Sequence, residues 1–223
     1  MNLASVTSAA ESLIEQVLTE RNGPACVTCS FQTECMALVH LVTRQRPDIP
    51  VLFLDTGYHF PETYAYRDSM TSMLDLNLVN LRPRITVAEQ EGQFGILYQS
   101  APDRCCGIRK VEPLFAGLDP YDVWFTGLRR DQSPTRANLR EADDFRLPSG
   151  KVMYKVSPLV DWTARDTWSY LKEHNIPVLP LYERGYTSIG CEPCTSLPVD
   201  PDNPRSGRWA GRKLECGIHI SGQ

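Results

Sequence analysis

The sequence lacks a long hydrophobic run. No stretch approaches the roughly 18 to 20 apolar residues that a membrane-spanning helix needs, and residues 1–20 do not place an apolar run behind a basic segment, as a secretory signal would. We therefore expect a cytoplasmic protein that makes no membrane contact.

The sequence also lacks an excess of positive charge. It has 23 Lys and Arg against 27 Asp and Glu, a net charge of -4. Proteins that bind nucleic acid through bulk charge usually carry a basic face, so no nucleic-acid partner is expected. Internal repeats, low-complexity segments, the Walker pattern and the G-x-G-x-x-G pattern are absent too.

What the sequence does contain is an alternation of apolar strands and amphipathic helices. The 223 residues predict strands at 25–30, 49–54, 76–81, 122–126 and 152–156, and helices at 9–20, 35–44, from 62, from 86, 107–117 and from 164 to near 174. Thr163 and Asp166 form a predicted capping box at the last of these helices. This order indicates an α/β fold with a mostly parallel sheet and helices on both faces.

Three predicted loops follow strands, at 30–34, 55–59 and 127–136. Because ligands of such sheets bind at the carboxyl ends of the strands, we expect the three loops to open on one edge. The first can direct backbone N–H groups and the hydroxyls of Ser30 and Thr33 at a phosphate beside a helix N-terminus. The third carries Arg129 and Arg136, which suit phosphate or sulfate oxygens, although an isolated arginine cluster is equally typical of a surface salt-bridge patch.

Eight cysteines in a reducing compartment point to metal or redox chemistry rather than a disulfide framework. Cys105 adjoins Cys106, and Cys191 and Cys194 form a C-x-x-C. Four thiolates suit an iron-sulfur cluster or a zinc ion. Adjacent cysteine side chains diverge, which favours the cluster, where each thiolate binds a different iron. Four unrelated buried thiols are the third interpretation.

The remaining cysteines of the first fifty residues are predicted to lie in the core. Cys26 and Cys29 have an odd separation in a strand, so their side chains should point to opposite faces rather than to one metal ion. Cys35 is interpreted in the same way, as a core residue of the following helix.

The chain ends in a basic segment that contains one cysteine. Cys216 lies among Arg205, Arg208, Arg212 and Lys213, and His219 follows it. Neighbouring cations favour the nucleophilic thiolate; a solvated basic tail with an incidental thiol is the alternative. The Pro- and Gly-rich run 198–211 is a candidate linker that would free this tail from the core. We therefore expect an α/β domain at 1–200 and a tail at 201–223.

Together these motifs resemble a known family. The segments Cys105-Cys106 with Arg109-Lys110, Cys191-Glu192-Pro193-Cys194 and Glu215-Cys216-Gly217-Ile218-His219, supported by Leu54-Asp55-Thr56-Gly57 and Gly127-Leu128-Arg129, are similar to those of the assimilatory adenylyl-sulfate (APS) reductases. These are relatives of the phosphoadenylyl-sulfate (PAPS) reductases within the adenine nucleotide α-hydrolase-like fold. The chain departs from that superfamily's Ser-Gly-Gly-x-Asp-Ser loop, since it has Ser30-Phe31-Gln32-Thr33-Glu34-Cys35.

The resemblance implies a 4Fe-4S cluster on Cys105, Cys106, Cys191 and Cys194, with Cys216 as the nucleophile that forms an S-sulfocysteine and releases AMP. It also implies a separate thioredoxin-like dithiol protein that frees sulfite, and it leaves the oligomeric state open, a homo-oligomer included. The predicted substrate contacts are Ser30, Thr33, Lys110, Arg129, Arg136, Arg205, Arg208 and His219.

Three other functions remain open at this stage. PAPS reductases of the common type lack the two cysteine pairs, so the pairs favour APS, but reduction of PAPS or of both nucleotides uses the same chemistry. An ATP-dependent RNA-thiolating enzyme of the same fold also uses clusters and active cysteines. A non-catalytic zinc or cluster module would explain the cysteine pairs but not the match at 215–219.

Overall fold

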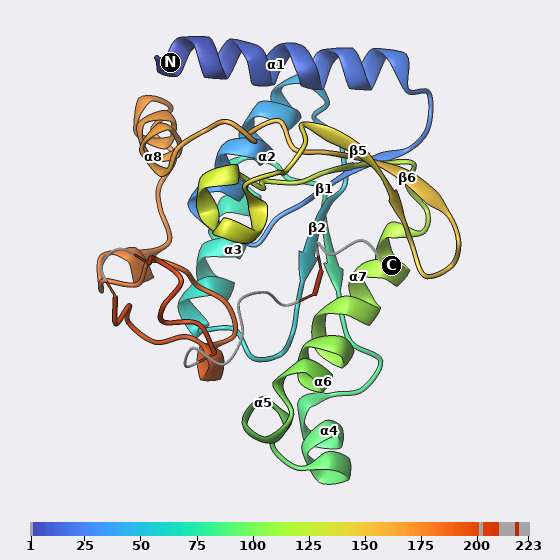
Figure 1. The fold of residues 1–223 in the computed structure, drawn as a ribbon, viewed down its shortest axis with the longest axis vertical. Helices are drawn as coiled ribbons and strands as arrows, with labels where there is room; N and C mark the ends of the chain where they lie inside the picture. Colours follow the sequence, from blue (N-terminus) through green and yellow to red (C-terminus); the bar gives the residue numbers. More distant parts are fainter. Residues whose placement is uncertain (1, 201–202, 210–216, 219–223) are drawn as a thin grey trace.

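A computed structural model describes residues 2–200, 203–209 and 217–218. Its centre is a six-stranded sheet with the order β3-β2-β1-β4-β6-β5 (Figure 1). The parallel strands are β1 (Ala25–Thr28), β2 (Val51–Leu54), β3 (Leu78–Leu81), β4 (Val123–Phe125) and β6 (Val152–Val156), and β5 (Ala142–Arg146) pairs antiparallel to β6. The predicted α/β class and all five predicted strands are confirmed; β5 was not predicted.

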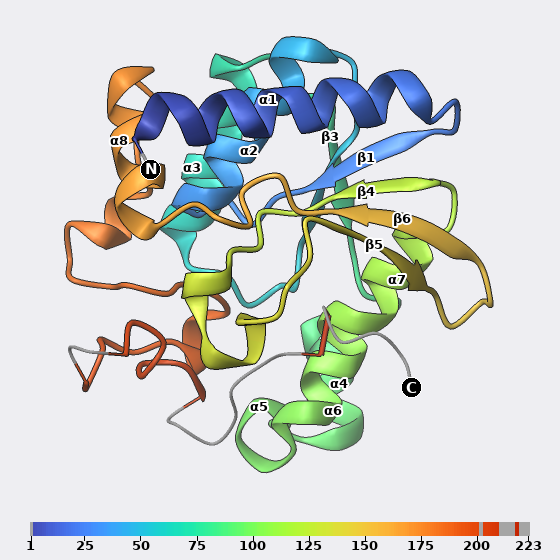
Figure 2. The ribbon, with the colours of Figure 1, turned by 45° about the horizontal axis from the view of Figure 1, so that its top comes forward.

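Helices cover both faces of the sheet (Figure 2). One face carries α1 (Leu3–Glu20), α2 (Thr33–Gln45), α3 (Pro61–Met73) and α8 (Ala164–Glu173), and the other carries α7 (Glu112–Leu118). Side chains alternate across a strand, so neighbours in β1 enter different cores. Cys26 packs in the cluster with Leu114 and Trp124, and Val27 packs in the larger cluster under α1 and α2.

Local sequence explains where the helices begin. The Asn2 side chain accepts a hydrogen bond from the Ser5 N–H at 2.9 Å, so α1 starts at Leu3 rather than at residue 9. The capping box predicted at Thr163 is present, with reciprocal bonds to Asp166 of 3.2 and 2.7 Å. Helix α2 begins at Thr33, so this residue lies in the first helical turn and not in the predicted loop.

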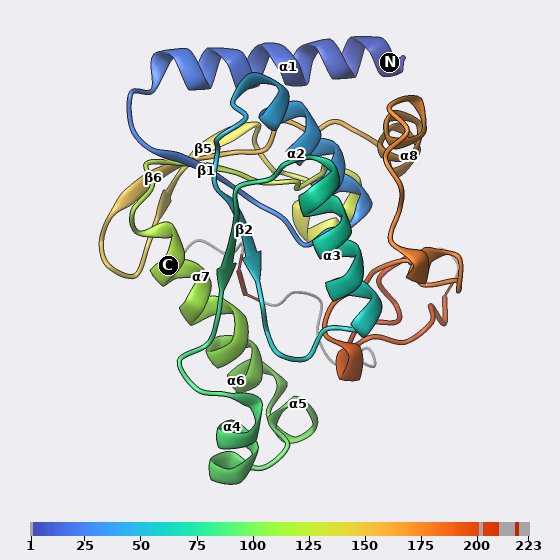
Figure 3. The same cartoon turned by 180° about the vertical axis from the view of Figure 1, so that it is seen from behind.

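The chain between β3 and α7 forms a projection away from the sheet (Figures 1 and 3). It contains α4 (Val87–Phe94), α5 (Leu97–Ser100), α6 (Pro102–Cys106) and the π-helical turn η1 (Gly107–Val111), which leads into α7. The helix predicted at 107–117 is therefore the later part of a longer helical segment that starts at Pro102 and ends at Leu118. Pi-helical turns are rare and often mark functional sites.

In the part of the chain that the structure describes, four short 3-10 turns lie in the connections, two between β4 and β5 and two after α8. They are η2 (Arg130–Gln132), η3 (Pro134–Arg136), η4 (Pro180–Tyr182) and η5 (Glu192–Cys194). Among the described residues, no helix combines the length and the apolar character that crossing a bilayer requires.

Candidate active site

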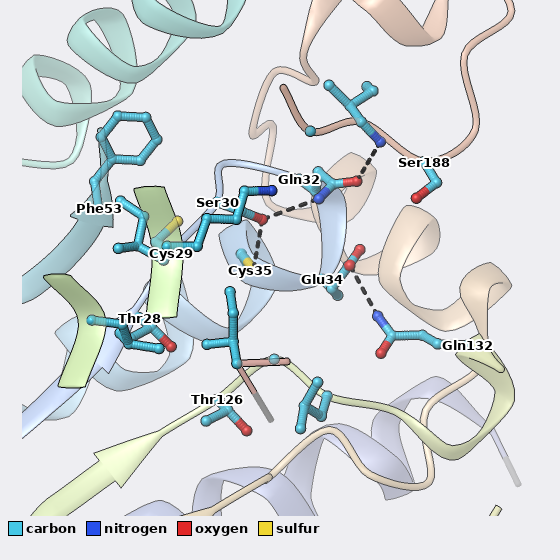
Figure 4. A pocket seen from close by; sticks show the side chains of 18 of the residues that line it. Thr28, Cys29, Ser30, Gln32, Glu34, Cys35, Phe53, Thr126, Gln132 and Ser188 are labelled. Atoms are coloured by element: carbon cyan, nitrogen blue, oxygen red, sulfur yellow. Dashed lines mark hydrogen bonds between the residues drawn. The ribbon is translucent and has the colours of Figure 1, made fainter. Parts of the chain in front are cut away.

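A cavity opens at the carboxyl ends of the strands, as the positions of the three loops predicted. Its wall includes Ser30 after β1, Thr56 after β2 and Gly127 after β4. Figure 4 shows polar side chains around this cavity, with Ser30 between Gln32 and Cys35. The Ser30 Oγ lies 3.3 Å from Cys35 Sγ and accepts a hydrogen bond of 3.1 Å from Gln32 Nε2. The first loop thus presents hydroxyl, amide and thiol groups to the cavity.

The turn of this first loop depends on Phe31. Its φ is +59°, in the left-handed region that bulky residues rarely adopt. The ring is fully buried and packs edge-on against Phe53 and Tyr66, with centroid separations of 5.5 and 6.3 Å. This aromatic anchor holds the chain reversal between β1 and α2, and with it the cavity wall.

Two glutamine bridges tie the first loop to distant segments. Gln32 Oε1 accepts a bond of 2.9 Å from the Ile189 N–H, and Gln132 Nε2 donates to Glu34 Oε1 at 2.9 Å. Loops from β1, from β4 and from the C-terminal third of the chain therefore form one connected rim.

Cationic side chains dominate the charge of the cavity. It is lined by Lys110, Arg136, Arg205 and Arg208. His59 also lines it, but burial lowers the pKa of its imidazole to about 4, so the ring is neutral near pH 7 and donates from Nε2 to the Leu54 carbonyl at 2.8 Å. Because arginine and lysine pair with phosphate and sulfate oxygens, the cavity suits a polyanionic ligand.

A second, smaller cavity adjoins the first and is lined by all four paired cysteines: Cys105, Cys106, Cys191 and Cys194. Cys105 and Cys106 end α6, and Cys191 and Cys194 flank and end η5. Folding therefore places the two distant pairs in the wall of one cavity. Their role as ligands stays a prediction.

The loop after β2 brings the second pair into place. His59 forms an antiparallel bridge with Cys191, and the Glu192 N–H donates to the Tyr58 carbonyl at 2.7 Å. The Thr56 hydroxyl lies 3.3 Å from Cys191 Sγ. The segment that carries the C-x-x-C is therefore docked on the strand-end loop that also lines the larger cavity.

The small cavity combines thiols whose pKa values are raised with a buried guanidinium. Burial raises the pKa of the Cys105 thiol and, with Cys191 and Cys106 adding to it, raises that of Cys194 to about 11. Arg109 is 2% exposed; its Nε donates to Gln90 Oε1 at 2.9 Å, yet its Nη2 has no hydrogen-bond partner among the described residues. A buried cation without a carboxylate fits a site for a negatively charged centre.

All four paired thiols line the small cavity. Within the described ranges, no three His, Cys, Asp or Glu side chains form a group that could hold one metal ion.

Lys110 and Trp209 line both cavities and so form their common wall. Lys110 is 8% exposed and follows Arg109 in the π-helical turn, which turns both side chains inward. Trp209 has a φ of +49° and is 6% exposed, and the Arg208 guanidinium lies over its ring at 4.5 Å. A strained, buried tryptophan at such a boundary is typical of a functional site.

Comparisons with known proteins agree with this geometry. Residues 24–197 match the family model described as the phosphoadenosine phosphosulfate reductase domain. The chain belongs to this family. It is 48% identical over 198 residues to an adenosine 5'-phosphosulfate reductase of Streptomyces coelicolor, covering 87% of this chain and 81% of the relative. It is 44% identical over 202 residues to one of Geobacillus kaustophilus, covering 86% and 82%.

A solved structure supports the fold. The PAPS reductase of Candida auris, solved as a phosphate complex, has a TM-score of 0.73 and 20% identity, covering 87% of this chain and 96% of that one. The expected adenine nucleotide α-hydrolase-like fold is thereby confirmed for this member of the PAPS reductase domain family.

The predicted substrate residues of this family member separate into three groups. Ser30, Lys110, Arg136, Arg205 and Arg208 line the larger cavity. Thr33 and Arg129 do not: the Thr33 hydroxyl donates to Glu34 Oε2 at 3.1 Å, and Arg129 is buried with bonds to Asp131 and to the Trp162 carbonyl. Cys216 and His219 lie outside the described residues.

Two sequence interpretations need correction. Cys35 is half-buried and lines the larger cavity, whereas the core prediction holds for Cys26 and Cys29, which enter the two opposite clusters. The predicted linker does not leave residues 203–209 free of the core. The Ser196 N–H donates to the Gly207 carbonyl at 2.8 Å, and Arg208 pairs with Thr195 in a β-bridge.

The sequence interpretation missed Trp209, Gln32, Gln132 and the cavity role of Cys35. A signal existed for Trp209, since it lies within the arginine-rich stretch already singled out, between Arg208 and Arg212. The glutamines gave none, because the residues they join are 98 and 157 positions apart in the chain.

Proposed function

We propose that this family member reduces adenylyl sulfate to sulfite and AMP in sulfate assimilation, with a 4Fe-4S cluster on Cys105, Cys106, Cys191 and Cys194. The observation that carries the proposal is the pair of adjoining cavities, one lined by four thiols and the other by four cations, which share Lys110 and Trp209. Two relatives at 48% and 44% identity are named adenosine 5'-phosphosulfate reductases.

The larger cavity would hold the nucleotide with its phosphosulfate among the cations. Arg205, Arg208 and Lys110 orient the sulfate and offset its charge, which an anionic nucleophile would otherwise oppose. Arg136, from the loop after β4, reaches the same cavity.

Cys216 is the proposed nucleophile. Its thiolate attacks the sulfur of adenylyl sulfate, an S–S bond forms, the bond from sulfur to the phosphate oxygen breaks, and AMP leaves. A thiolate of a thioredoxin-like dithiol protein then attacks Cys216 Sγ and expels sulfite. The second thiol of that protein displaces Cys216 as a thiol and leaves the partner oxidised to its disulfide.

A bound cluster would supply a fixed charge distribution beside Lys110. The residues that support this part of the proposal are the four thiols around one cavity and the buried Arg109 guanidinium with its unpartnered Nη2. The division at residue 200 into a domain and a tail that carries Cys216 also remains part of the proposal.

The test compares sulfite release from APS and PAPS by anaerobically purified protein supplied with thioredoxin. The proposal predicts fast release from APS and none from Cys216→Ser, which should keep its iron and its AMP binding. Cys194→Ser should lose iron first. Preferential turnover of PAPS would assign the alternative substrate, and sulfite release by Cys216→Ser would remove the proposed nucleophile.

A further inference from the structure

A fully buried amide side chain that has no part in the proposed mechanism lies against one of the four paired thiols. It belongs to Gln90 of α4, which is 0% exposed. Helix α4 lies in the projection beside α6, the helix that ends with Cys105 and Cys106 (Figures 1 and 3). Burying an amide costs free energy unless its donor and acceptor groups find partners. The partners of Gln90 therefore indicate what this side chain does.

Both ends of the Gln90 amide are bonded to the cysteine-lined site. The Nε2 donates to Cys105 Sγ at 3.9 Å, a long bond because a thiol sulfur is a large and weak acceptor. The Oε1 accepts from Arg109 Nε at 2.9 Å. Arg109 Nη1 donates in turn to the Ile85 carbonyl at 3.2 Å, which leaves Nη2 as the guanidinium nitrogen without a partner among the described residues. One amide thus orients a thiol and the buried cation beside it.

The backbone of α4 holds this amide in place. The Thr86 side chain and Glu89 form a capping box, with bonds of 3.2 and 2.7 Å, and the Gln90 N–H donates to the Thr86 carbonyl at 3.1 Å. Gln90 therefore lies in the first turn of a capped helix, where its backbone has little freedom.

The next residue of α4 reaches the other cysteine pair. Glu91 Oε1 accepts from the Tyr58 hydroxyl at 2.7 Å, and the Tyr58 carbonyl accepts from the N–H of Glu192 in the C-x-x-C segment, also at 2.7 Å. Helix α4 is therefore bonded directly to Cys105 and, through Tyr58, to the segment that carries the second pair.

We propose that Gln90 is a positioning residue of the cysteine site, one that helps the four thiols to retain iron. The inference rests on the proposed function, because it takes these thiols to hold a cluster. A thiol that binds iron does so as an anionic thiolate, and the Nε2–H of Gln90 supports that charge at Cys105 while Oε1 keeps Arg109 turned to the same site. Such partners of metal ligands typically contribute about 10- to 100-fold in metal affinity.

Two substitutions separate the donor of Gln90 from its acceptor. Gln90→Glu keeps the shape and an oxygen that accepts from Arg109, but it removes the N–H that reaches Cys105. Gln90→Leu removes both. Gln93→Leu is the matched control, because Gln93 is exposed on the same helix. Anaerobic protein should release iron to a chelator about 10- to 100-fold faster in both Gln90 variants, and at the wild-type rate in Gln93→Leu.

Resonance Raman spectroscopy of the iron–thiolate stretching bands gives a readout that loss of packing alone would not move. In wild type these bands should shift when the protein is prepared in deuterated buffer, because one thiolate accepts from an N–H, and Gln90→Glu should reduce that shift. Iron release from Gln90→Glu at the wild-type rate would overturn the proposal. An unchanged isotope shift in that variant would overturn it too, and would leave Gln90 as a packing residue. Anaerobic wild-type protein that holds no iron would count instead against the proposed function.

Discussion

Gly190 controls the position of an arginine of the proposed sulfate site. A Cβ at this position would lie 2.5 Å from Cζ of Arg208 and closer still to both terminal nitrogens of its guanidinium. Real Cβ atoms do not approach that closely, so Gly190→Ala must displace the guanidinium. The far end of a flexible side chain moves at little cost to folding, and the substitution should leave thermal stability nearly unchanged.

The displacement should weaken substrate binding by a calculable amount. Arg208 is 5% exposed and lies over the Trp209 ring, so its guanidinium has little space in which to find a second productive position. A charge-assisted hydrogen bond contributes about 1.5 to 3 kcal/mol, and each 1.4 kcal/mol is about tenfold. Gly190→Ala should therefore raise the Kd for adenylyl sulfate by about 10- to 100-fold.

Calorimetric titration of anaerobic Gly190→Ala with adenylyl sulfate, in the Cys216→Ser background to prevent turnover, measures this effect. Gly92→Ala is the matched control, because no described atom lies within 4 Å of the Cβ it would add on α4. Wild-type affinity in Gly190→Ala would refute the reasoning that places Arg208 on the substrate.

Three further variants test other parts of the account. Arg109→Met should lower iron per chain, because it removes the buried guanidinium beside the four thiols; iron equal to that of wild type would contradict this role. Trp209→Ala should lower both iron content and AMP affinity, whereas Trp168→Ala, at a 41% exposed position, should lower neither. If Trp209→Ala lowered only the iron content or only the AMP affinity, the tryptophan would not be a shared wall of the two cavities. Burial, reinforced by the charges of His174 and Arg44, lowers the pKa of His40 to about 4. The folded state therefore favours the neutral imidazole of His40. The stability that this side chain contributes is fully present above pH 6.5 and is lost as pH falls from 6.5 toward 4. Between pH 6.5 and 4, the Tm of His40→Gln should fall less steeply than that of wild type. An equal fall of Tm in the two proteins would contradict the lowered pKa of His40.

The sequence predicted the parts of the fold that depend on local pattern. Strands β2 and β4 are continuous apolar runs, as both-sided burial in a parallel sheet requires. Strand β5 escaped prediction because Ala-Asp-Asp-Phe-Arg has a single buried residue, Phe145, and lies at the sheet edge. Strand β5 forms because it pairs with β6, and its own amino-acid composition gives no sign of a strand.

The sequence predicted which residue types form the site better than it predicted which way each side chain points. The four paired cysteines gather around one cavity, as their identities suggested. Arg129 and Arg136 looked equivalent in sequence, yet one donates to the Trp162 carbonyl in the interior and the other lines the cavity. Cys35 appeared to be core because its helix is apolar, but the first turn of α2 faces the cavity. Such differences arise from contacts between distant segments, which local pattern does not contain.

The most direct test of the central claim uses anaerobic protein, adenylyl sulfate labelled in its sulfur, and no reductant. Peptide mass analysis should find the label on Cys216, and thioredoxin should release it as sulfite. Label elsewhere, or no label on Cys216 when iron and nucleotide are both bound, would contradict a mechanism in which that thiol attacks sulfur.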